Sequence, residues 1–236
     1  MKWRFNPPWR NETRIVASSR DPFWQRCEHL EFKVFSDCQY IQGNGLQRIH
    51  AFDRYQRSVF VASGCGQDDI SGVIRLIFNN GRDMKKSYFP TLSGARLIHR
   101  SDGGRAASEN NSDRLLIYKD RYTADLLSLP ADGCVDVSTM SVLPEKRDAS
   151  ISRSLITRAI LLAWEMSVRY ALGAIDTRFL EKLLSRGLPF VPIGPSVPYW
   201  GSPTTPVLMD TYRIPKGVGR MMIQIMKFKA MIGGTI

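Results

Sequence analysis

Three charged residues stand out because they lie within or beside apolar segments. Arg75 lies in the run Ile70–Phe78, Asp136 lies in Cys134–Val142, and Asp53 follows Phe52 upstream of Arg75. A carboxylate can take a proton from a reacting group, and the planar fork of an arginine can hold a carboxylate through two parallel hydrogen bonds. These residue types could therefore transfer a proton beside a carboxylate that an arginine holds in place. A second interpretation is that Asp136 simply pairs with Arg75, because a buried charge needs a partner.

The segments around these residues predict a mixed α/β domain. Apolar positions at near-helical spacing predict helices, β-branched runs predict strands, and the alternation of the two predicts crossover units on a mixed sheet. Ser150 or Ser152 is the expected N-cap of the long second helix, and Gly187 ends the third. The expected helices are 23–37, 150–172 and 178–185, and the expected strands are 59–63, 70–78, 134–142, 173–176 and 207–210.

The chain divides into one main domain with two extensions. Prolines and polar residues predict an extended arm over 1–22, and the domain itself spans 23–214. Residues 99–114 are polar and predict a surface insertion. Residues 215–236 end in a basic amphipathic segment, for which packing on the domain is favoured over contact with a membrane or a partner.

Composition narrows the function classes. The 236 residues are 43% hydrophobic and carry a net charge of +11, which indicates an acidic partner or a solvated basic surface. Nucleic acid is not favoured, because the basic residues are spread along the chain and form no recognisable binding motif. No apolar run reaches the ~20 residues that cross a bilayer, and no apolar segment follows the charged start of the chain. We therefore expect a cytoplasmic protein.

Metal chemistry is not expected. The four cysteines, Cys27, Cys38, Cys65 and Cys134, form no Cys-x-x-Cys pair, and the three histidines are scattered. Such spacing argues against a zinc site or a redox motif. The sequence therefore predicts no metal and no bound cofactor.

Several motifs together resemble one enzyme family. They are Phe52-Asp53, the stretch from Arg75 to Met84 with Phe89 beyond it, Val135–Val142, and Leu183–Phe190 followed by Ile193-Gly194-Pro195. Their order and spacing over roughly residues 28 to 212 resemble the acyl-homoserine-lactone synthases. Those enzymes are acyltransferases of the GNAT fold, in which a mixed central sheet with two splayed parallel strands is flanked by helices.

The resemblance implies a reaction and roles for individual residues. An acyl group would pass from an acidic acyl carrier protein to the amine of S-adenosylmethionine, with the donor arm between strands 134–142 and 173–176. Asp136 stands where the family has a glutamate and would take the amine proton. Arg75 and Asp53 would hold the acceptor by ion pairing. The residues expected to bind substrate are Phe35, Ser138, Thr139, Met84, Phe89, Trp164 and Phe179.

The donor site departs from most GNAT enzymes. Their Gln/Arg-x-x-Gly-x-Gly/Ala loop, which cradles the pyrophosphate of coenzyme A, is missing here. Lys146, Arg147 and Arg153 stand instead beside the expected start of a helix. A helix N-terminus with cations can hold a single phosphate, which favours a carrier-protein phosphopantetheine over coenzyme A.

Further departures cluster on the acceptor side and leave three readings open. The family's first-helix arginine is Glu31 here, its tryptophan falls near Ile41, its first paired aspartate is His50, and its strand arginine is Thr139. The first reading is an acyl-homoserine-lactone synthase. The second is an N-acyl-amino-acid synthase of the same fold. The third is a non-catalytic protein that uses the scaffold to bind an acidic partner.

Overall fold

The structure is a computed structural model that describes residues 12–39, 57–64, 69–78, 91, 133–147, 149–194, 196–199 and 201–214. Asp53, Met84, Phe89, the expected insertion 99–114 and the C-terminal segment 215–236 lie outside this description. Within it, none of the helices combines the length and apolarity that crossing a bilayer requires.

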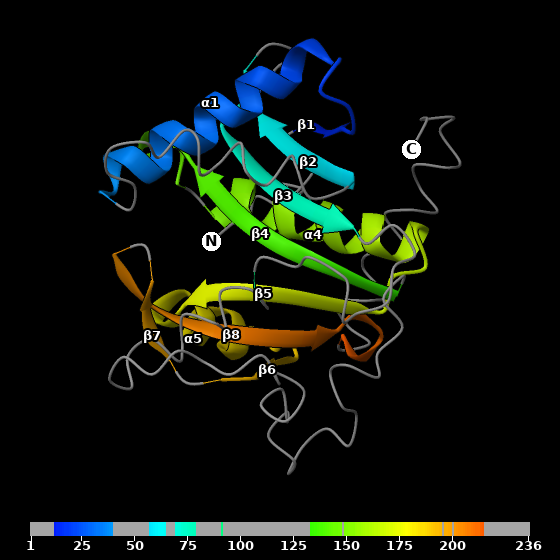
Figure 1. The fold of residues 1–236 in the computed structure, drawn as a ribbon, viewed down its shortest axis with the longest axis vertical. Coiled ribbons are helices and arrows are strands. Elements are labelled where there is room, and N and C mark those ends of the chain that lie inside the picture. Colours follow the sequence, from blue (N-terminus) through cyan, green and yellow to red (C-terminus); the bar gives the residue numbers. More distant parts are fainter. Residues whose placement is uncertain are drawn as a thin grey trace, which may run out of the picture.

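One mixed sheet forms the centre of the described fold. Its strands lie in the order β1-β2-β3-β4-β5-β8-β6, with β7 paired to β8 (Figure 1). Every neighbouring pair is antiparallel except β4 and β5, which are parallel. The predicted mixed sheet is therefore confirmed. The strands are β1 (Glu12–Val16), β2 (Arg57–Gly64), β3 (Gly72–Phe78), β4 (Cys134–Val142), β5 (Tyr170–Asp176), β6 (Phe190–Pro192), β7 (Val197–Tyr199) and β8 (Ser202–Asp210).

Helix α1 (Pro22–Asp37) covers one face of the N-terminal strands. The Asp21 side chain caps it by accepting a hydrogen bond from the Phe23 N–H at 2.9 Å, and Pro22 supplies the fixed φ that suits a first turn. The buried face of the helix packs Trp24 edge-on against Phe60 of β2, with ring centroids 4.9 Å apart. The helix is thereby docked on the strand beside β3.

Helix α4 (Ala149–Glu165) covers the opposite face. On β2, Val59 and Val61 belong to the core under α4, whereas Phe60 and Ala62 belong to the core under α1. Because successive strand residues point to opposite sides of a sheet, the two helices sandwich the sheet. Helix α5 (Thr177–Ser185) follows β5 and packs on β5, β6 and β8. These three helices and the sheet create the walls of the site described below.

Helix α4 packs closely against the sheet at Gly72. A methyl group on Gly72 would lie 3.0 Å from Ile151 Cγ2 and 3.0 Å from Leu155 Cδ1, both on α4. We expect Gly72→Ala to lower the free energy of unfolding by about 1–3 kcal/mol, because extra volume in a packed core forces side chains off their rotamers. Urea denaturation measures this change.

Gly173 supplies the matched control. A methyl group there would meet its nearest atom, the Val137 carbonyl oxygen, at an ordinary 3.6 Å. Gly173→Ala is therefore expected to have the smaller effect on unfolding. Equal effects of the two substitutions would contradict the close packing of α4 at Gly72.

Three predicted elements have boundaries that are wrong by three residues or more. The predicted strand 207–210 is only the second half of β8, which begins at Ser202. The other two are the helix 150–172 and the strand 173–176. The predicted helix 150–172 ends at Glu165, because Ser167 takes a left-handed φ of 57° and the chain turns back toward the sheet. Residues 170–172 then pair with 134–136, so β5 begins three residues before the predicted strand. Ser150 and Ser152 lie inside the helix and do not precede it.

The sequence did not predict three of the observed strands, β1, β6 and β7. Residues 12–16 fall in the predicted arm but form β1, an edge strand paired with β2. The short strands β6 and β7 both pair with β8. Each has only three residues, which is too short for a pattern of alternation to reveal. The described domain therefore starts before residue 23.

Candidate active site

The parallel strands β4 and β5 part halfway along their length. Residues 134–137 pair with residues 170–173, and no pairing continues beyond Val137 and Gly173. Both strands nevertheless run on, β4 to Val142 and β5 to Asp176. Figure 1 shows the two arrows separating toward the end of the sheet that lies near the C-terminal end of α1. The predicted splay of these strands is confirmed.

A β-bulge in β4 lies where the strands begin to part. Arg75 of β3 is opposite Thr139 and Leu76 is opposite Val137, so Ser138 is the extra residue. Asp136 is opposite Ile77, and residues 75 and 77 share one face of β3. The bulge therefore brings Asp136 and Thr139 to the same face, although they are three residues apart. The Ser138 hydroxyl is buried and has no hydrogen-bond partner among the described residues.

A cavity of about 700 Å³ opens between the parted strands. Its size falls in the usual range of ligand pockets, ~300–1,000 Å³. Most of its wall is apolar and comes from both sides of the sheet, and such a wall suits an aliphatic chain. Apolar lining residues include Val34 and Phe35 of α1, Ile156, Ala159, Ile160 and Ala163 of α4, Leu172 of β5, Phe179 and Leu183 of α5, and Met209 of β8.

Three cations also line this cavity. Arg147 follows the short 3-10 helix η7 (Pro144–Lys146), Lys182 lies on α5, and Arg186 is the C-cap residue of α5. Arg147 is held by hydrogen bonds from Nε to the Val142 carbonyl and from Nη2 to Cys38 Sγ, both at 3.3 Å. Lys182 and Arg186 are exposed. The arrangement suits an anionic group, such as a phosphate, at the cavity.

Asp136 is fully buried beside the cavity. Asp136 itself is not among the lining residues, but its Oδ2 accepts a hydrogen bond of 2.8 Å from the backbone N–H of Thr91, which is one of them. Its Oδ1 has no partner among the described residues. Burial raises the pKa of Asp136 to about 7, although the hydrogen bonds from Thr91 oppose this increase. A carboxyl group with such a pKa can exchange a proton near neutral pH.

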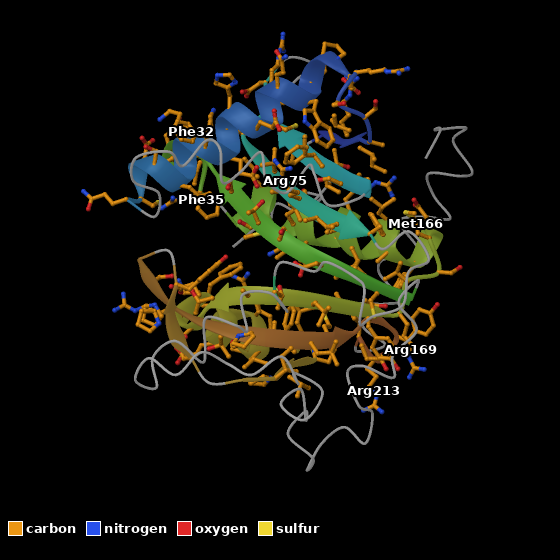
Figure 2. The ribbon with its side chains drawn as sticks, in the orientation of Figure 1. Phe32, Phe35, Arg75, Met166, Arg169 and Arg213 are labelled. Atoms are coloured by element: carbon orange, nitrogen blue, oxygen red, sulfur yellow. The ribbon has the colours of Figure 1, made fainter. Side chains whose placement is uncertain are left out.

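Arg75, labelled in Figure 2, lies in the core between α1 and the sheet. It is not part of the cavity wall. Its guanidinium pairs with Glu31 of α1: Nη2 donates to Oε2 at 2.7 Å, and Nε donates to Oε2 at 3.2 Å and to Oε1 at 3.3 Å. It also lies 4.3 Å from the centre of the Phe60 ring. The interpretation that Arg75 pairs with Asp136 is therefore wrong.

Glu31 is the residue that sequence reasoning missed. It is fully buried, and it also accepts a hydrogen bond from the Thr139 hydroxyl. Two of the four departures from the family pattern, Glu31 and Thr139, thus contact each other. A signal was present in the sequence, because Glu31 lies four residues after Cys27 and seven after Trp24 on the apolar stripe of α1. A carboxylate on such a stripe needs a buried cation.

The structure brings only some of the predicted substrate residues together. Phe35, Ser138, Thr139, Phe179 and Arg147 line the cavity.

Three other predicted residues do not reach the cavity. Lys146 and Arg153 are exposed, since the α4 residues that face the cavity are Ser152 and those about one, two and three turns further on. Trp164 packs against the core between α4 and the sheet. The cations at the cavity come instead from Arg147 and α5. In the described part of the chain, no three His, Cys, Asp or Glu side chains gather to hold a metal ion.

Comparisons with known proteins place this geometry in a structural class. No protein-family model matches the sequence, and neither does any curated protein. Solved structures do match. The coenzyme A-dependent acyl-homoserine lactone synthase BjaI, solved with S-adenosylmethionine and isopentyl-coenzyme A, is 12% identical, with a TM-score of 0.57 over 90% of this chain and 87% of that chain.

Two further structures match at similar levels. FeeM, an N-acyl amino acid synthase from uncultured soil microbes, is 13% identical, with a TM-score of 0.54 over 86% of this chain and 91% of its own. The acyl-homoserine lactone synthase LasI is 9% identical, with a TM-score of 0.51 over 85% of this chain and 90% of its own. At these identities the likeness shows the fold. The predicted GNAT-like fold is thus confirmed.

Proposed function

We propose that this protein is an N-acyltransferase that moves a fatty acyl group from an acyl carrier protein to the amine of S-adenosylmethionine, giving an acyl-homoserine lactone. The observation that carries the proposal is the apolar cavity at the point where β4 and β5 part. A fold shared with BjaI, which was solved with both S-adenosylmethionine and an acyl-coenzyme A, supports it.

The acyl donor enters between the parted strands. Beyond Val137 the edge of β4 that faces β5 pairs with no strand in the described part of the chain, so its backbone groups are available to a thioester arm. The acyl chain lies against the apolar residues of α4 and α5. The attack of the amine nitrogen on the thioester carbon forms the amide bond and breaks the carbon–sulfur bond.

Asp136 is the general base of this reaction. The amine loses its proton to Asp136, and the departing thiolate takes up a proton to become the free thiol. Asp136 is one methylene shorter than the glutamate of the family and does not line the cavity, so a water molecule relays the proton. The carboxylate of the acylated product then closes the lactone and expels methylthioadenosine.

An acidic carrier protein is the donor partner. Lys182 and Arg186 are exposed at the cavity, and Arg147 lies on its wall. Opposite charges speed the encounter of two proteins and orient them. The net charge of +11 also favours an acidic partner. Acyl-coenzyme A is therefore expected to be the poorer donor.

The double variant Lys182→Ala/Arg186→Ala tests the docking. We expect it to raise the KM for the acyl carrier protein about three- to tenfold at low salt, the effect of removing two exposed charge pairs. Salt should raise the wild-type KM in the same way and affect the variant less, because exposed charges are screened beyond ~10 Å at 0.1 M. Steady-state kinetics at several salt concentrations measures both effects.

An exposed arginine away from the cavity wall is the control. Arg20 lies just before α1 and is not among the cavity residues, so Arg20→Ala should leave the KM unchanged. Equal use of carrier-bound and coenzyme A-bound acyl groups, without any salt effect, would refute the carrier assignment.

A second candidate is an N-acyl amino acid synthase. The fold shared with FeeM supports it, and so does the contact between Glu31 and Thr139, which replaces two arginines of the lactone synthase pattern. The open cavity of about 700 Å³ favours both enzymes over a non-catalytic binding protein, which would not need a space for an acyl chain.

One experiment separates the candidates. Purified protein is incubated with octanoyl carrier protein and either S-adenosylmethionine or a mixture of amino acids, and the products are identified by mass spectrometry. An acyl lactone together with methylthioadenosine supports the first function. An acyl amino acid without methylthioadenosine supports the second, and no acylated product from any mixture would contradict both.

A further inference from the structure

The hydrogen bond between Thr139 and Glu31 fixes the direction of the Thr139 hydroxyl. Thr139 lines the cavity and Glu31 does not. The Thr139 Oγ1 donates its only hydrogen to Glu31 Oε1. Glu31 cannot reverse this bond, because a carboxylate accepts hydrogen bonds and has none to donate. The Thr139 oxygen therefore has lone pairs left but no hydrogen.

Arg75 holds Glu31 in this arrangement. Three hydrogen bonds join the guanidinium to the two carboxylate oxygens, and both side chains are completely buried. Ion pairs of this kind have fixed geometry, because the planar fork of arginine matches the carboxylate. Since Arg75 comes from β3, Glu31 from α1 and Thr139 from β4, three elements cooperate to orient one hydroxyl group.

We propose that Glu31 is a positioning residue that makes Thr139 a pure hydrogen-bond acceptor toward the cavity, and that the acyl acceptor places an N–H donor against it. This inference rests on the proposed acyltransferase function and identifies where the nitrogen lies. The β-bulge places Thr139 on the same face of β4 as Asp136. A nitrogen held by Thr139 therefore lies on the side of the strand from which Asp136 removes a proton.

Two isosteric ligands test the polarity of this site. N-hexyloctanamide carries an N–H beside its carbonyl, and hexyl octanoate has an oxygen in its place. Isothermal titration calorimetry should show that the wild type binds the amide about tenfold more tightly than the ester, the effect of gaining one hydrogen bond and avoiding one unpaired acceptor. Equal binding of the two probes, or no binding of either, overturns the proposal.

Two substitutions of Thr139 form a matched pair. Thr139→Val keeps the shape but removes the oxygen, so the preference for the amide should fall to about one. Thr139→Ser keeps the hydroxyl and should keep the preference. If the residue had only a structural role, Thr139→Val would weaken both probes together and leave their ratio unchanged, which would overturn the proposal.

Glu31→Gln provides a sharper test, because it should reverse the preference. The glutamine oxygen would accept from Arg75 and its amide N–H would donate to Thr139. The Thr139 hydrogen would then be free to point into the cavity, and the ester should bind at least as tightly as the amide. An unchanged amide preference in folded Glu31→Gln overturns the role of Glu31. If this variant does not fold, the Thr139 pair still decides the role of Thr139, and Glu31→Asp, which keeps the carboxylate, should retain the amide preference.

The two levels of the proposal can fail separately. The binding assay requires no turnover, so a Thr139-dependent amide preference without acyl transfer to any acceptor refutes the proposed function alone. Acyl transfer by a wild type that binds the two probes equally refutes the inference about Glu31 and Thr139 alone.

Discussion

Replacing Asp136 with asparagine should lower kcat for acyl transfer by about 10²–10⁴-fold while the protein stays folded. This is the usual contribution of a positioned general base, and asparagine cannot take a proton. Asparagine keeps the shape of the side chain and can still accept the hydrogen bond from the Thr91 N–H. Single-turnover kinetics with carrier protein that already bears its acyl group measures the loss of kcat, and circular dichroism confirms the fold.

The dependence on pH gives a second readout for Asp136. Its pKa is raised to about 7, so wild-type activity should rise through pH 7 and level off above it. The folded state favours the neutral carboxyl. The contribution of Asp136 to stability is therefore complete below the ordinary aspartate pKa and is lost as pH rises through about 7. Asp136→Asn should remove this decline and be the more stable protein at pH 9.

Asp210 is the matched control for Asp136. It is also buried, but it pairs with Arg169 at 2.9 Å and does not line the cavity. Asp210→Asn should keep the pH dependence of activity in every preparation that folds. Full activity of Asp136→Asn, or a wild-type rate without a rise near pH 7, would remove Asp136 from the mechanism.

Arg75→Ala should lower the free energy of unfolding by about 3–5 kcal/mol, because removal of one partner leaves the other charge buried and unpaired. Arg75 and Glu31 are both completely buried in the ion pair. The acceptor-binding role that the family resemblance implies for Arg75 would instead give a folded but inactive variant, because such a residue lies outside the core. Chemical denaturation followed by circular dichroism decides between the two outcomes.

An exposed ion pair provides the comparison for Arg75. Arg14 pairs with Asp21 at 3.1 Å with about half of its side chain exposed, so Arg14→Ala should cost about 0–1 kcal/mol. The double variant Arg75→Met/Glu31→Met should recover much of the stability lost in Arg75→Ala, since well-packed apolar residues can replace a buried ion pair. Similar losses in Arg14→Ala and Arg75→Ala would contradict the assignment.

Local patterns predicted most of the described elements. Strand β4 has the predicted bounds, because its apolar run is closed by Pro144. The end of α4 was missed because apolar residues at helical spacing continue to Val168, beyond the last helical residue, Glu165. What ends the helix is the left-handed Ser167 and the pairing of Tyr170 with Cys134. That pairing is a tertiary contact, and local periodicity carries no information about it.

The site was predictable to the extent that its residues are neighbours in sequence or match a family pattern. Ser138 and Thr139 were found in this way, and both line the cavity. Glu31 was not, since its partner Arg75 is 44 residues away and only the docking of α1 joins them. The cations Lys182 and Arg186 were missed for the same reason, because α5 reaches the cavity only through the order of strands in the sheet.

The parallel pairing of β4 with β5 has a mechanical consequence. It divides the described sheet into two antiparallel leaves, β1 to β4 and β5 to β8, each made from one continuous part of the sequence (Figure 1). Strand pairing joins the two leaves at only four residue pairs, from Cys134–Tyr170 to Val137–Gly173. A ligand in the cavity contacts both leaves and therefore links them. Ligand should therefore slow hydrogen exchange at these four pairs more than within either leaf.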